Sequence, residues 1–460
     1  MQGLASLRIQ PKTSLSNMSH RDRLRRDALS IFQSGVAAVS SDAAVRSHVR
    51  LEKNSLQIGE KTYNIADRKI FVIAFGKAAA AMTFALESIL GDQLSGGVAV
   101  TKYGHAAGFK LKKAACHEAA HPVPDEKSVA ASQAIYEFAS KLGKDDLVIV
   151  AISGGGSALL TLPVEGVSLA DKQATTHALL GCGAEIQEIN TVRTQLSRVK
   201  GGRLAQAIHP AELCTLVLSD VIGDPLDFIA SGPTVPATTN AAAALRICER
   251  YEILENLPRN VRTFLQNSAN DPAAKVPQSV FKNNQVVVVG NLLQALEAAA
   301  KKAHELGYDT QILTTSLQGE AREIAQIYPA FAADILKNNL PIKPPSCILT
   351  GGETTVTLRG NGKGGRNQEL ALAAINKLAG QACSVLLSAG TDGSDGPTDA
   401  TGAIIDDQSL ERAREAGLDV EQYLAQNNAY PFFEALGDLI ITGPTHTNVM
   451  DMQILLVERR

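Results

Sequence analysis

Short runs of β-branched and other apolar residues recur along the 460-residue chain, and Ala- and Leu-rich amphipathic segments separate them. Strand runs that alternate with helical patterns predict βαβ units, an α/β fold and mainly parallel sheets. Because ligands bind at the carboxyl ends of parallel strands, we expect a functional site where these runs end in Gly, Ser or Asp. The expected strands are 70–76, 146–153, 214–220, 285–290, 346–352 and 384–390.

The chain is too long for one ordinary hydrophobic core, so two or three domains are expected. The strand rhythm is lost between residues 253 and 284, where Pro, Asn, Asp and Lys gather. We therefore expect two Rossmann-like domains, 21–275 and 280–460. Residues 1–20 contain basic residues but no acidic one, which predicts a disordered tail or a weak mitochondrial targeting segment.

Composition limits the function classes. A net charge of −3 offers no basic field for nucleic acid, and no run of about 18 apolar residues could span a membrane. The six cysteines are scattered without a CxxC pair, which favours buried, reduced thiols over a zinc site. We therefore expect a cytoplasmic protein, with a mitochondrial address as the alternative and a homodimer as a possible assembly.

Two glycine-containing motifs follow expected strands in the first half of the chain. In FGKAAAAM (75–82), Lys77 lies between a strand and a helix, where an ammonium suits an anion. The alternative is a solvated surface lysine. In the second motif, Ser153, Gly154, Gly155, Gly156 and Ser157 form a run in which backbone N–H groups and hydroxyls can approach a phosphate. A flexible turn that only ends the strand is the alternative.

Two further segments carry candidate polar groups. The stretch 190–206 offers Asn190, Arg193 and Lys200 as candidate substrate-binding residues, although a charged helix face is an alternative explanation. Asp220 closes the strand near 214–220, where a carboxylate can accept a hydroxyl proton or hold Mg²⁺. Helix or turn capping would explain such an aspartate equally well.

The second half of the chain contains a loop, GNGKGG (360–365), that formally matches GxGxxG. This match is weak evidence for a dinucleotide site, because no acidic residue stands about 20 positions further on. Arg366 follows the loop at an expected helix start and suits bidentate contact with a phosphoryl group. Glu353 lies at a strand end as a candidate substrate contact, and Gly364 and Gly365 are candidate phosphate contacts. The loop after 384–390 carries Asp392 and Asp395, which are candidate Mg²⁺ ligands or a simple polar turn.

These motifs, with HPVPDEKS (121–128) and THTNVMDMQILLV (445–457), occur in the order typical of the class II glycerate kinases. From about residue 21 to residue 460 the chain resembles that family, with its glycerate kinase N-terminal region and its C-terminal MOFRL region. The resemblance implies two domains that face across a cleft, Mg-ATP as donor, D-glycerate as acceptor and 2-phosphoglycerate as product. It also implies that Lys77 and Arg366 are the functional lysine and arginine.

Two other functions remain open from the sequence. A nicotinamide-dependent hydroxypyruvate reductase would use the GNGKGG loop, but Lys and Arg stand there where dinucleotide folds use small residues. A non-catalytic nucleotide- or sugar-acid-binding module would not need both Lys77 and Arg366.

Overall fold

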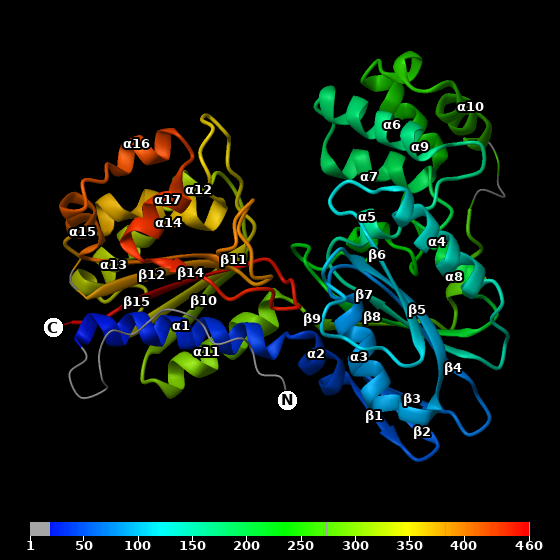
Figure 1. The fold of residues 1–460 in the computed structure, drawn as a ribbon, viewed down its shortest axis with the longest axis horizontal. Helices are drawn as coiled ribbons and strands as arrows, with labels where there is room; N and C mark the ends of the chain where they lie inside the picture. Colours follow the sequence, from blue (N-terminus) through cyan, green and yellow to red (C-terminus); the bar gives the residue numbers. More distant parts are fainter. Residues whose placement is uncertain (1–18, 270, 272–274, 382, 460) are drawn as a thin grey trace. The chain divides into compact units, whose positions relative to one another are not determined.

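The computed structural model describes residues 19–269, 271, 275–381 and 383–459 (Figure 1). The chain divides into two compact units, and each is described by itself. The central unit comprises residues 41–289. The terminal unit combines the chain up to residue 40 with the chain from residue 290 onwards.

The central unit is built on a six-stranded sheet with the order β6-β5-β4-β7-β8-β9. Each of the four pairs β6-β5, β5-β4, β4-β7 and β7-β8 is parallel. In chain order this is 3-2-1-4-5-6, the Rossmann arrangement, whose topological switch point lies between its first and fourth strands, here β4 and β7. The expectation of a mainly parallel sheet is confirmed in this unit. The strands are β4 (Ile70–Phe75), β5 (Leu94–Lys102), β6 (Ala114–Ala119), β7 (Leu147–Ile152), β8 (Glu212–Leu218) and β9 (Gln285–Gly290).

Helices cover this sheet because its strands are apolar on both faces. All six residues of β7 are buried, which is typical of a parallel strand between two helical layers. Helix α3 (Ala79–Leu90) packs on β4 and β5, and α4 (Glu126–Ala139) packs on β5 and β6. The remaining elements of this part are α2 (Ser41–His48), α5 (Gly156–Leu159), α8 (Arg203–Ile208) and the antiparallel strands β1 (Val49–Glu52), β2 (Ser55–Ile58) and β3 (Lys61–Asn64).

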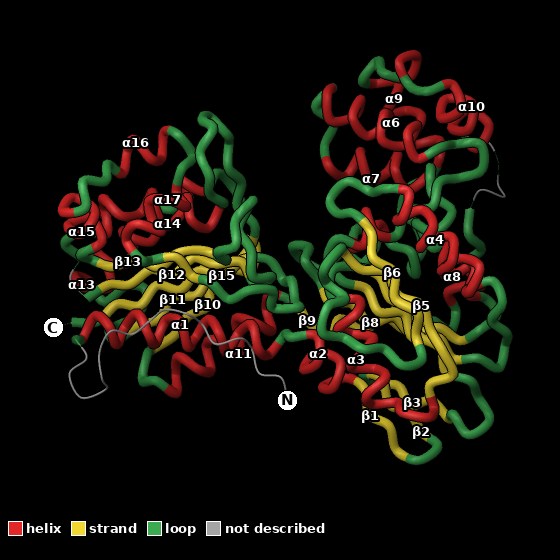
Figure 2. The backbone as a smooth tube through the Cα atoms, viewed as in Figure 1, coloured by secondary structure: helices red, strands yellow, loops and turns green. Residues whose placement is uncertain are grey.

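A group of helices without strands forms a second part of the central unit, seen as red tubes in Figure 2. These helices enclose their own apolar core, which contains Leu179, Val192, Cys248 and Leu265. They are α6 (Leu169–Gly181), α7 (Ile186–Gln195), α9 (Ala241–Arg250) and α10 (Arg259–Ser268). Helices α6 and α7 follow the SGGGS run directly in the chain, so they can bring side chains to the carboxyl edge of the sheet.

The terminal unit has a mixed sheet with the order β10-β11-β15-β12-β13-β14. Only β10 and β11 form a parallel pair, and the other four pairs are antiparallel. The expectation of a mainly parallel sheet is therefore wrong here, because the last strand, β15, inserts antiparallel between β11 and β12. The strands are β10 (Asp309–Leu317), β11 (Ser346–Gly352), β12 (Ser384–Gly390), β13 (Gly402–Asp406), β14 (Leu439–Ile440) and β15 (Asp451–Val457).

Helices cover both faces of this sheet. Helices α1 (His20–Ala38) and α11 (Leu292–Glu305) pack together on one face. The other face is covered by α12 (Ala321–Ile324), α13 (Ile327–Asn338), α14 (Arg366–Leu378) and α17 (Ala429–Leu436), with α15 (Ser409–Glu415) and α16 (Val420–Ala425) beside them. The run 355–358 between β11 and α14, which resembles a hairpin strand in sequence, forms only an isolated bridge from Thr355 to Glu320.

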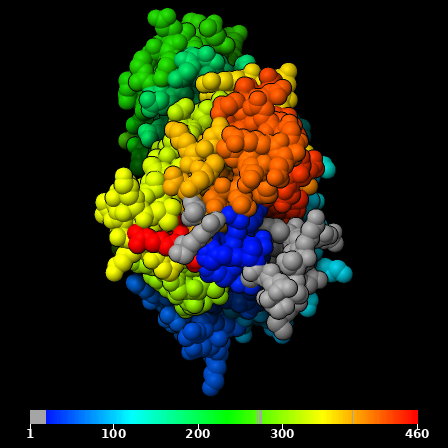
Figure 3. Space-filling view, turned by 90° about the vertical axis from the view of Figure 1, so that its left-hand side faces the viewer, coloured from blue at the N-terminus to red at the C-terminus, as the bar shows by residue number. Residues whose placement is uncertain are grey.

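Helix α1 is the N-terminal element of the terminal unit, far in sequence from the strands it covers. Figure 3 shows it in blue beside the orange atoms of the C-terminal part. Arg25 donates to Asp406 and Asp438 at 2.6 Å each, and Leu24 and Ile31 are fully buried. Among the described residues no single helix could cross a membrane, although His20–Ala38 and Ser41–His48 would pass that test as a bent pair.

The observed division differs from the expected ranges 21–275 and 280–460. Helix α1 belongs with the C-terminal part, and β9 belongs to the central sheet. Strand β9 is held there because Gln285 accepts a hydrogen bond from Tyr63 at 2.7 Å, and Val286 and Val288 pack on the central core. Residues 1–18 of the expected N-terminal tail lie outside the described residues, whereas Ser19 caps α1 by accepting from the Asp22 N–H.

Candidate functional site

The switch point of the central sheet joins two of the predicted motifs. The Lys77 N–H donates to the Gly154 carbonyl at 2.8 Å, and the Ala78 N–H donates to Ser153 Oγ at 3.0 Å. Gly76 has φ +122°, and a Cβ there would lie 2.3 Å from Ser153 Oγ. Only glycine allows this approach, so the turn after β4 and the SGGGS run after β7 form one rigid structure.

The SGGGS run is closely surrounded by protein groups. A Cβ on Gly155, whose φ is +79°, would lie 2.8 Å from the His121 ring and 3.3 Å from Lys77 Cγ. A Cβ on Gly156 would lie 2.9 Å from the Ala230 Cβ. The glycines therefore let Lys77 and His121 lie directly against the loop. His121 belongs to the HPVPDEKS motif, but no role for this residue was predicted from the sequence.

Lys200 is a buried cation that supports the same loop. Its Nζ donates to the Ser157 carbonyl at 3.0 Å and to the Ala230 carbonyl at 3.2 Å. Burial and the nearby charges of Arg193 and Lys172 hold its pKa well below the usual range. Ala230 and Ser231 both have positive φ, 51° and 64°. Such strained backbone persists where the surroundings determine it strongly, as they often do at functional sites.

Three more cations lie near Lys200, and with it we call them the cationic cluster: Lys172, Arg193, Lys200 and Arg203. Lys172 on α6 is only 7% exposed. Burial and the charges of Arg193 and Arg203 lower its pKa to about 7. Arg193 on α7 and Arg203 on α8 also have pKa values lowered by burial. Lys172 is not among the residues predicted from the sequence, although this lysine shares the inner face of α6 with Leu169, Thr175 and Leu179 at helical spacing.

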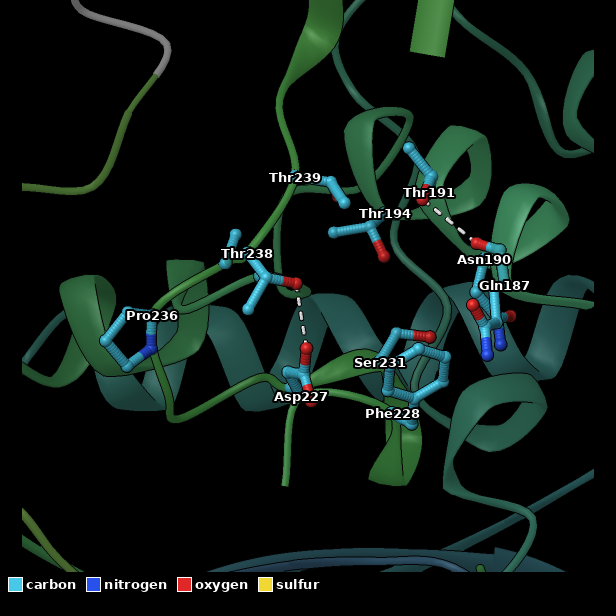
Figure 4. Close-up of a pocket in the computed structure, with 13 residues that line it drawn as sticks. Gln187, Asn190, Thr191, Thr194, Asp227, Phe228, Ser231, Pro236, Thr238 and Thr239 are labelled. Atoms are coloured by element: carbon cyan, nitrogen blue, oxygen red, sulfur yellow. Dashed lines mark hydrogen bonds between the residues drawn. The ribbon is translucent and has the colours of Figure 1, made fainter. Parts of the chain in front are cut away.

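Asn190 and Asp220 are the two remaining candidate residues of the central unit. Asn190 lines a small pocket between α7 and the segment 227–239, together with Thr194 and Ser231 (Figure 4). In the pocket wall the Thr238 hydroxyl donates to Asp227 at 2.8 Å. Asp220 follows β8 at the carboxyl edge of the sheet and is partly buried. The roles predicted for both residues stay predictions.

Arg366 lies at the first residue of α14 in the terminal unit and is held by two carboxylates. Its Nε and Nη2 donate to Asp451 at 2.5 and 3.0 Å, and its Nη1 donates to Glu353 at 2.6 Å. Burial alone would lower its pKa, but the hydrogen bonds and charge of Asp451, with Glu353 and Asp395, raise it above the usual value. These contacts use three of the five guanidinium donors, so a phosphoryl contact would share the group with Asp451 and Glu353.

The amino end of α14 is already capped by a carboxylate. Asp395 accepts from the Asn367 N–H at 3.1 Å and from the Gln368 N–H at 2.9 Å. Burial, and to a lesser degree the charge of Asp451, raise the pKa of Asp395 to about 7. A Cβ on Gly365 would lie 2.2 Å from the Asp395 carboxyl carbon, and one on Gly364 would lie 3.2 Å from the Ala429 N. This geometry gives both glycines a packing role, and a phosphate contact by them stays a prediction.

The predicted magnesium ligands do not form a preformed cage. Within the described parts of the chain, no three His, Cys, Asp or Glu side chains are grouped to hold a metal ion. Asp395 directs both oxygens at α14, and Asp392 Oδ1 accepts from the Ser394 N–H at 3.0 Å. Protein sites for Mg²⁺ often contribute only one or two carboxylates and take the other ligands from water and substrate phosphates. Asp392 fits that mode better than Asp395, and the metal role of both stays a prediction.

The strand order and the glycine-lined switch point define a Rossmann-type α/β protein. Two family models match the chain: a domain of unknown function (DUF4147) over residues 27–266 and the MOFRL family over residues 346–451. The D-glycerate 2-kinase of Thermotoga maritima is 41% identical over 436 residues, which cover 95% of this chain and 99% of that protein. The chain therefore belongs to the class II glycerate kinase family.

A solved structure and a relative with another name refine this comparison. A crystal structure of a glycerate kinase from Thermotoga maritima superposes with a TM-score of 0.85 at 40% identity, covering 95% of this chain and 99% of that one. A provisionally named hydroxypyruvate reductase of Agrobacterium vitis is 44% identical over 389 residues, which cover 84% of this chain and 98% of that protein. Both kinds of name thus occur among proteins similar to this chain.

Proposed function

We propose that this protein transfers the γ-phosphoryl group of ATP to the 2-hydroxyl of D-glycerate, giving 2-phospho-D-glycerate and ADP. The observation that carries the proposal is the junction of Lys77 with the SGGGS run at the switch point of a Rossmann-ordered sheet. Relatives named glycerate 2-kinase or glycerate kinase, similar over nearly their whole length, support the choice of substrate.

The central unit supplies the groups that phosphoryl transfer needs. Positioning and electrostatic stabilisation account for nearly all catalysis in this chemistry. The Lys77 ammonium would neutralise anionic oxygens beside the loop, and the SGGGS run would offer backbone N–H groups and the Ser157 hydroxyl. Asp220, at the same edge of the sheet, is the residue we propose to accept the proton of the glycerate hydroxyl.

Arg366 is the arginine that we propose for this chemistry, and within the terminal unit Asp451 and Glu353 hold its guanidinium in a fixed orientation. A bound Mg²⁺ would neutralise charge on the nucleotide phosphates, with Asp392 as the carboxylate best suited to contact it. Asp395 would act in this scheme by fixing the start of α14, and hence the position of Arg366.

A coupled assay of ADP formation tests the activity. The purified chain with ATP and Mg²⁺ is expected to release ADP only when D-glycerate is added. Phosphorus NMR of the product then distinguishes 2-phosphoglycerate from 3-phosphoglycerate. ADP release that does not depend on glycerate would exclude the proposal, and a 3-phosphoglycerate signal alone would correct its regiochemistry.

Hydroxypyruvate reduction is the second candidate, because a relative with that provisional name is 44% identical. The geometry of the GNGKGG loop speaks against it. Residues 353–365 separate β11 from α14, whereas a dinucleotide fingerprint joins strand and helix by a tight turn. At the start of α14, where a pyrophosphate would bind, the Asn367 and Gln368 N–H groups donate to Asp395 instead. NADH oxidation with hydroxypyruvate, followed at 340 nm in the same preparation, would favour the reductase.

A further inference from the structure

The cationic cluster contacts the SGGGS run through Lys200, and its four members have no acidic partners among the described residues. Among the described residues, none of Lys172, Arg193, Lys200 and Arg203 forms an ion pair with Asp or Glu, and acidic groups do not appear among the causes of their pKa shifts. A buried charge normally has an opposite charge or several hydrogen bonds, because its desolvation is costly. A cluster that lacks acids is therefore arranged for an anion from outside the chain.

The four side chains divide into two pairs. Lys200 and Arg203 are bonded to backbone carbonyls: Lys200 to Ser157 and Ala230, and Arg203 to Thr194 at 2.9 Å. Lys172 and Arg193 have no side-chain hydrogen-bond partner among the described residues. Lys172 is nonetheless 93% buried, since only 7% of it is exposed. Lys200 and Arg203 thus support the local fold, whereas the side chains of Lys172 and Arg193 are available to bind a ligand.

The cluster adjoins the proposed active site. The Lys200 ammonium lies 3.0 Å from the Ser157 carbonyl and 3.3 Å from its hydroxyl, at the end of the SGGGS run. The turn after Lys200 is held by Ser231 and Gly232, whose carbonyls accept from the N–H groups of Gly201 and Gly202 at 3.0 and 2.8 Å. Lys200 is therefore fixed on a hydrogen-bonded turn that is continuous with the SGGGS run.

We propose that Lys172 and Arg193 bind a phosphate group directly, with Lys200 and Arg203 adding to the positive field. A phosphate ester carries close to two negative charges near neutral pH and accepts from several donors at once, so it balances such a cluster better than a single carboxylate does. This inference rests on the proposed function for the source of the ligand. The phosphate belongs to the nucleotide or to the phosphorylated glycerate.

Isothermal titration calorimetry of the full chain with ADP, 2-phosphoglycerate and inorganic phosphate tests the proposal without requiring turnover. The variants are Lys172→Met, which keeps an unbranched side chain one heavy atom shorter, and Arg193→Gln. Lys141→Met, at an exposed lysine of the same unit, is the matched control. We expect both cluster variants to weaken at least one probe by about tenfold to a hundredfold, as for the loss of a charge-assisted hydrogen bond, and the control to change none.

The pattern across probes identifies the source. Weakened ADP binding with unchanged 2-phosphoglycerate binding assigns the cluster to the nucleotide, and the reverse pattern assigns it to the phosphorylated acceptor. Wild-type protein that binds none of the probes, or variants that bind all of them within about twofold of wild type, would overturn the proposal. If Lys172→Met fails to fold, as judged by circular dichroism, Arg193→Gln decides by the same criteria.

The proposed function and this inference fail separately. Glycerate-dependent turnover with unaltered phosphate binding in the variants would support the kinase activity and exclude the phosphate-binding role of the cationic cluster. If the chain shows no turnover but binds phosphate in a way that depends on the cluster, the phosphate-binding role would be supported and the kinase activity excluded.

Discussion

Lys172→Met should stabilise the ligand-free protein near neutral pH, although it deletes a buried lysine. Lys172 has a pKa lowered from 10.5 to about 7, chiefly by burial and then by the charges of Arg193 and Arg203. At about 1.36 kcal/mol per pKa unit, holding Lys172 charged in the folded protein costs about 4 to 5 kcal/mol relative to the unfolded chain. Methionine fills a similar volume without that cost.

The sign of the pH dependence follows from proton binding. Between pH 7 and about pH 10.5 the unfolded lysine holds its proton while the folded one has released it. The unfolded state therefore binds more protons, and stability rises with pH across this window. From pH 7 to about pH 9.5 the gain attributable to Lys172 is about 3 kcal/mol. Below pH 7 both states hold the proton, and this contribution no longer changes.

The assay is unfolding of wild type, Lys172→Met and the Lys141→Met control at a series of pH values. Circular dichroism is the suitable probe, because the chain contains no tryptophan. A difference of about 3 kcal/mol corresponds to about 6–12 °C in Tm for a unit of this size. Lys200 also has a lowered pKa, so the variant should keep part of the slope. Identical pH slopes in wild type and Lys172→Met would refute the reasoning, since they would mean that Lys172 is exposed or paired.

Three further predictions concern the proposed reaction. Lys77→Ala should lower kcat/KM by at least about a hundredfold, as expected for loss of a charge that positions the phosphoryl group, while the Tm stays near that of wild type. Arg366→Ala should lower both kcat and Tm, because it leaves the buried Asp451 carboxylate without its partner at a cost of about 3–5 kcal/mol, whereas Arg366→Lys should retain part of both. Asp392→Asn should raise the Mg²⁺ concentration needed for half-maximal activity more than it changes the KM for glycerate. The comparison variant for this third prediction is Asp395→Asn, which should lower Tm with little effect on that Mg²⁺ requirement, since Asp395 caps α14.

Each of these predictions has its own contrary result. Near wild-type kcat/KM in Lys77→Ala would make Lys77 a surface residue. A rise in glycerate KM at constant kcat in Arg366→Lys would assign Arg366 to the substrate carboxylate and not to the transition state. Unchanged Mg²⁺ titrations in Asp392→Asn would show that the loop carrying Asp392 does not contribute to the metal site.

Local patterns were enough to predict six of the strands and to place two glycine-containing motifs at strand ends. The expected strands 70–76 and 146–153 are β4 and β7, and the Lys77 and SGGGS motifs lie at their carboxyl ends. This succeeds because a buried parallel strand needs a continuous apolar run, and the turn after it needs glycine where another backbone approaches. Both requirements are met by residues that are neighbours in the sequence, so a short stretch of sequence is enough to predict the strand and the turn after it.

Contacts between distant residues were decided only by the tertiary structure. Arg366 meets Asp451 across 85 positions, and α1 docks through Arg25 on Asp406, 381 positions away. Strand β15 inserts antiparallel between β11 and β12 because backbone pairing and burial act on whole strands, and no local pattern specifies which strands become neighbours.

Lys172 shows the same limit within the site. The helical spacing shows that Lys172 lies on the inner face of α6. Its lowered pKa, however, depends partly on Arg193 and Arg203, which belong to other helices. The sequence by itself determined which residues are cationic. Only the fold determined that these cations are buried together without acids, because desolvation and charge pairing depend on distances that the order of residues does not contain.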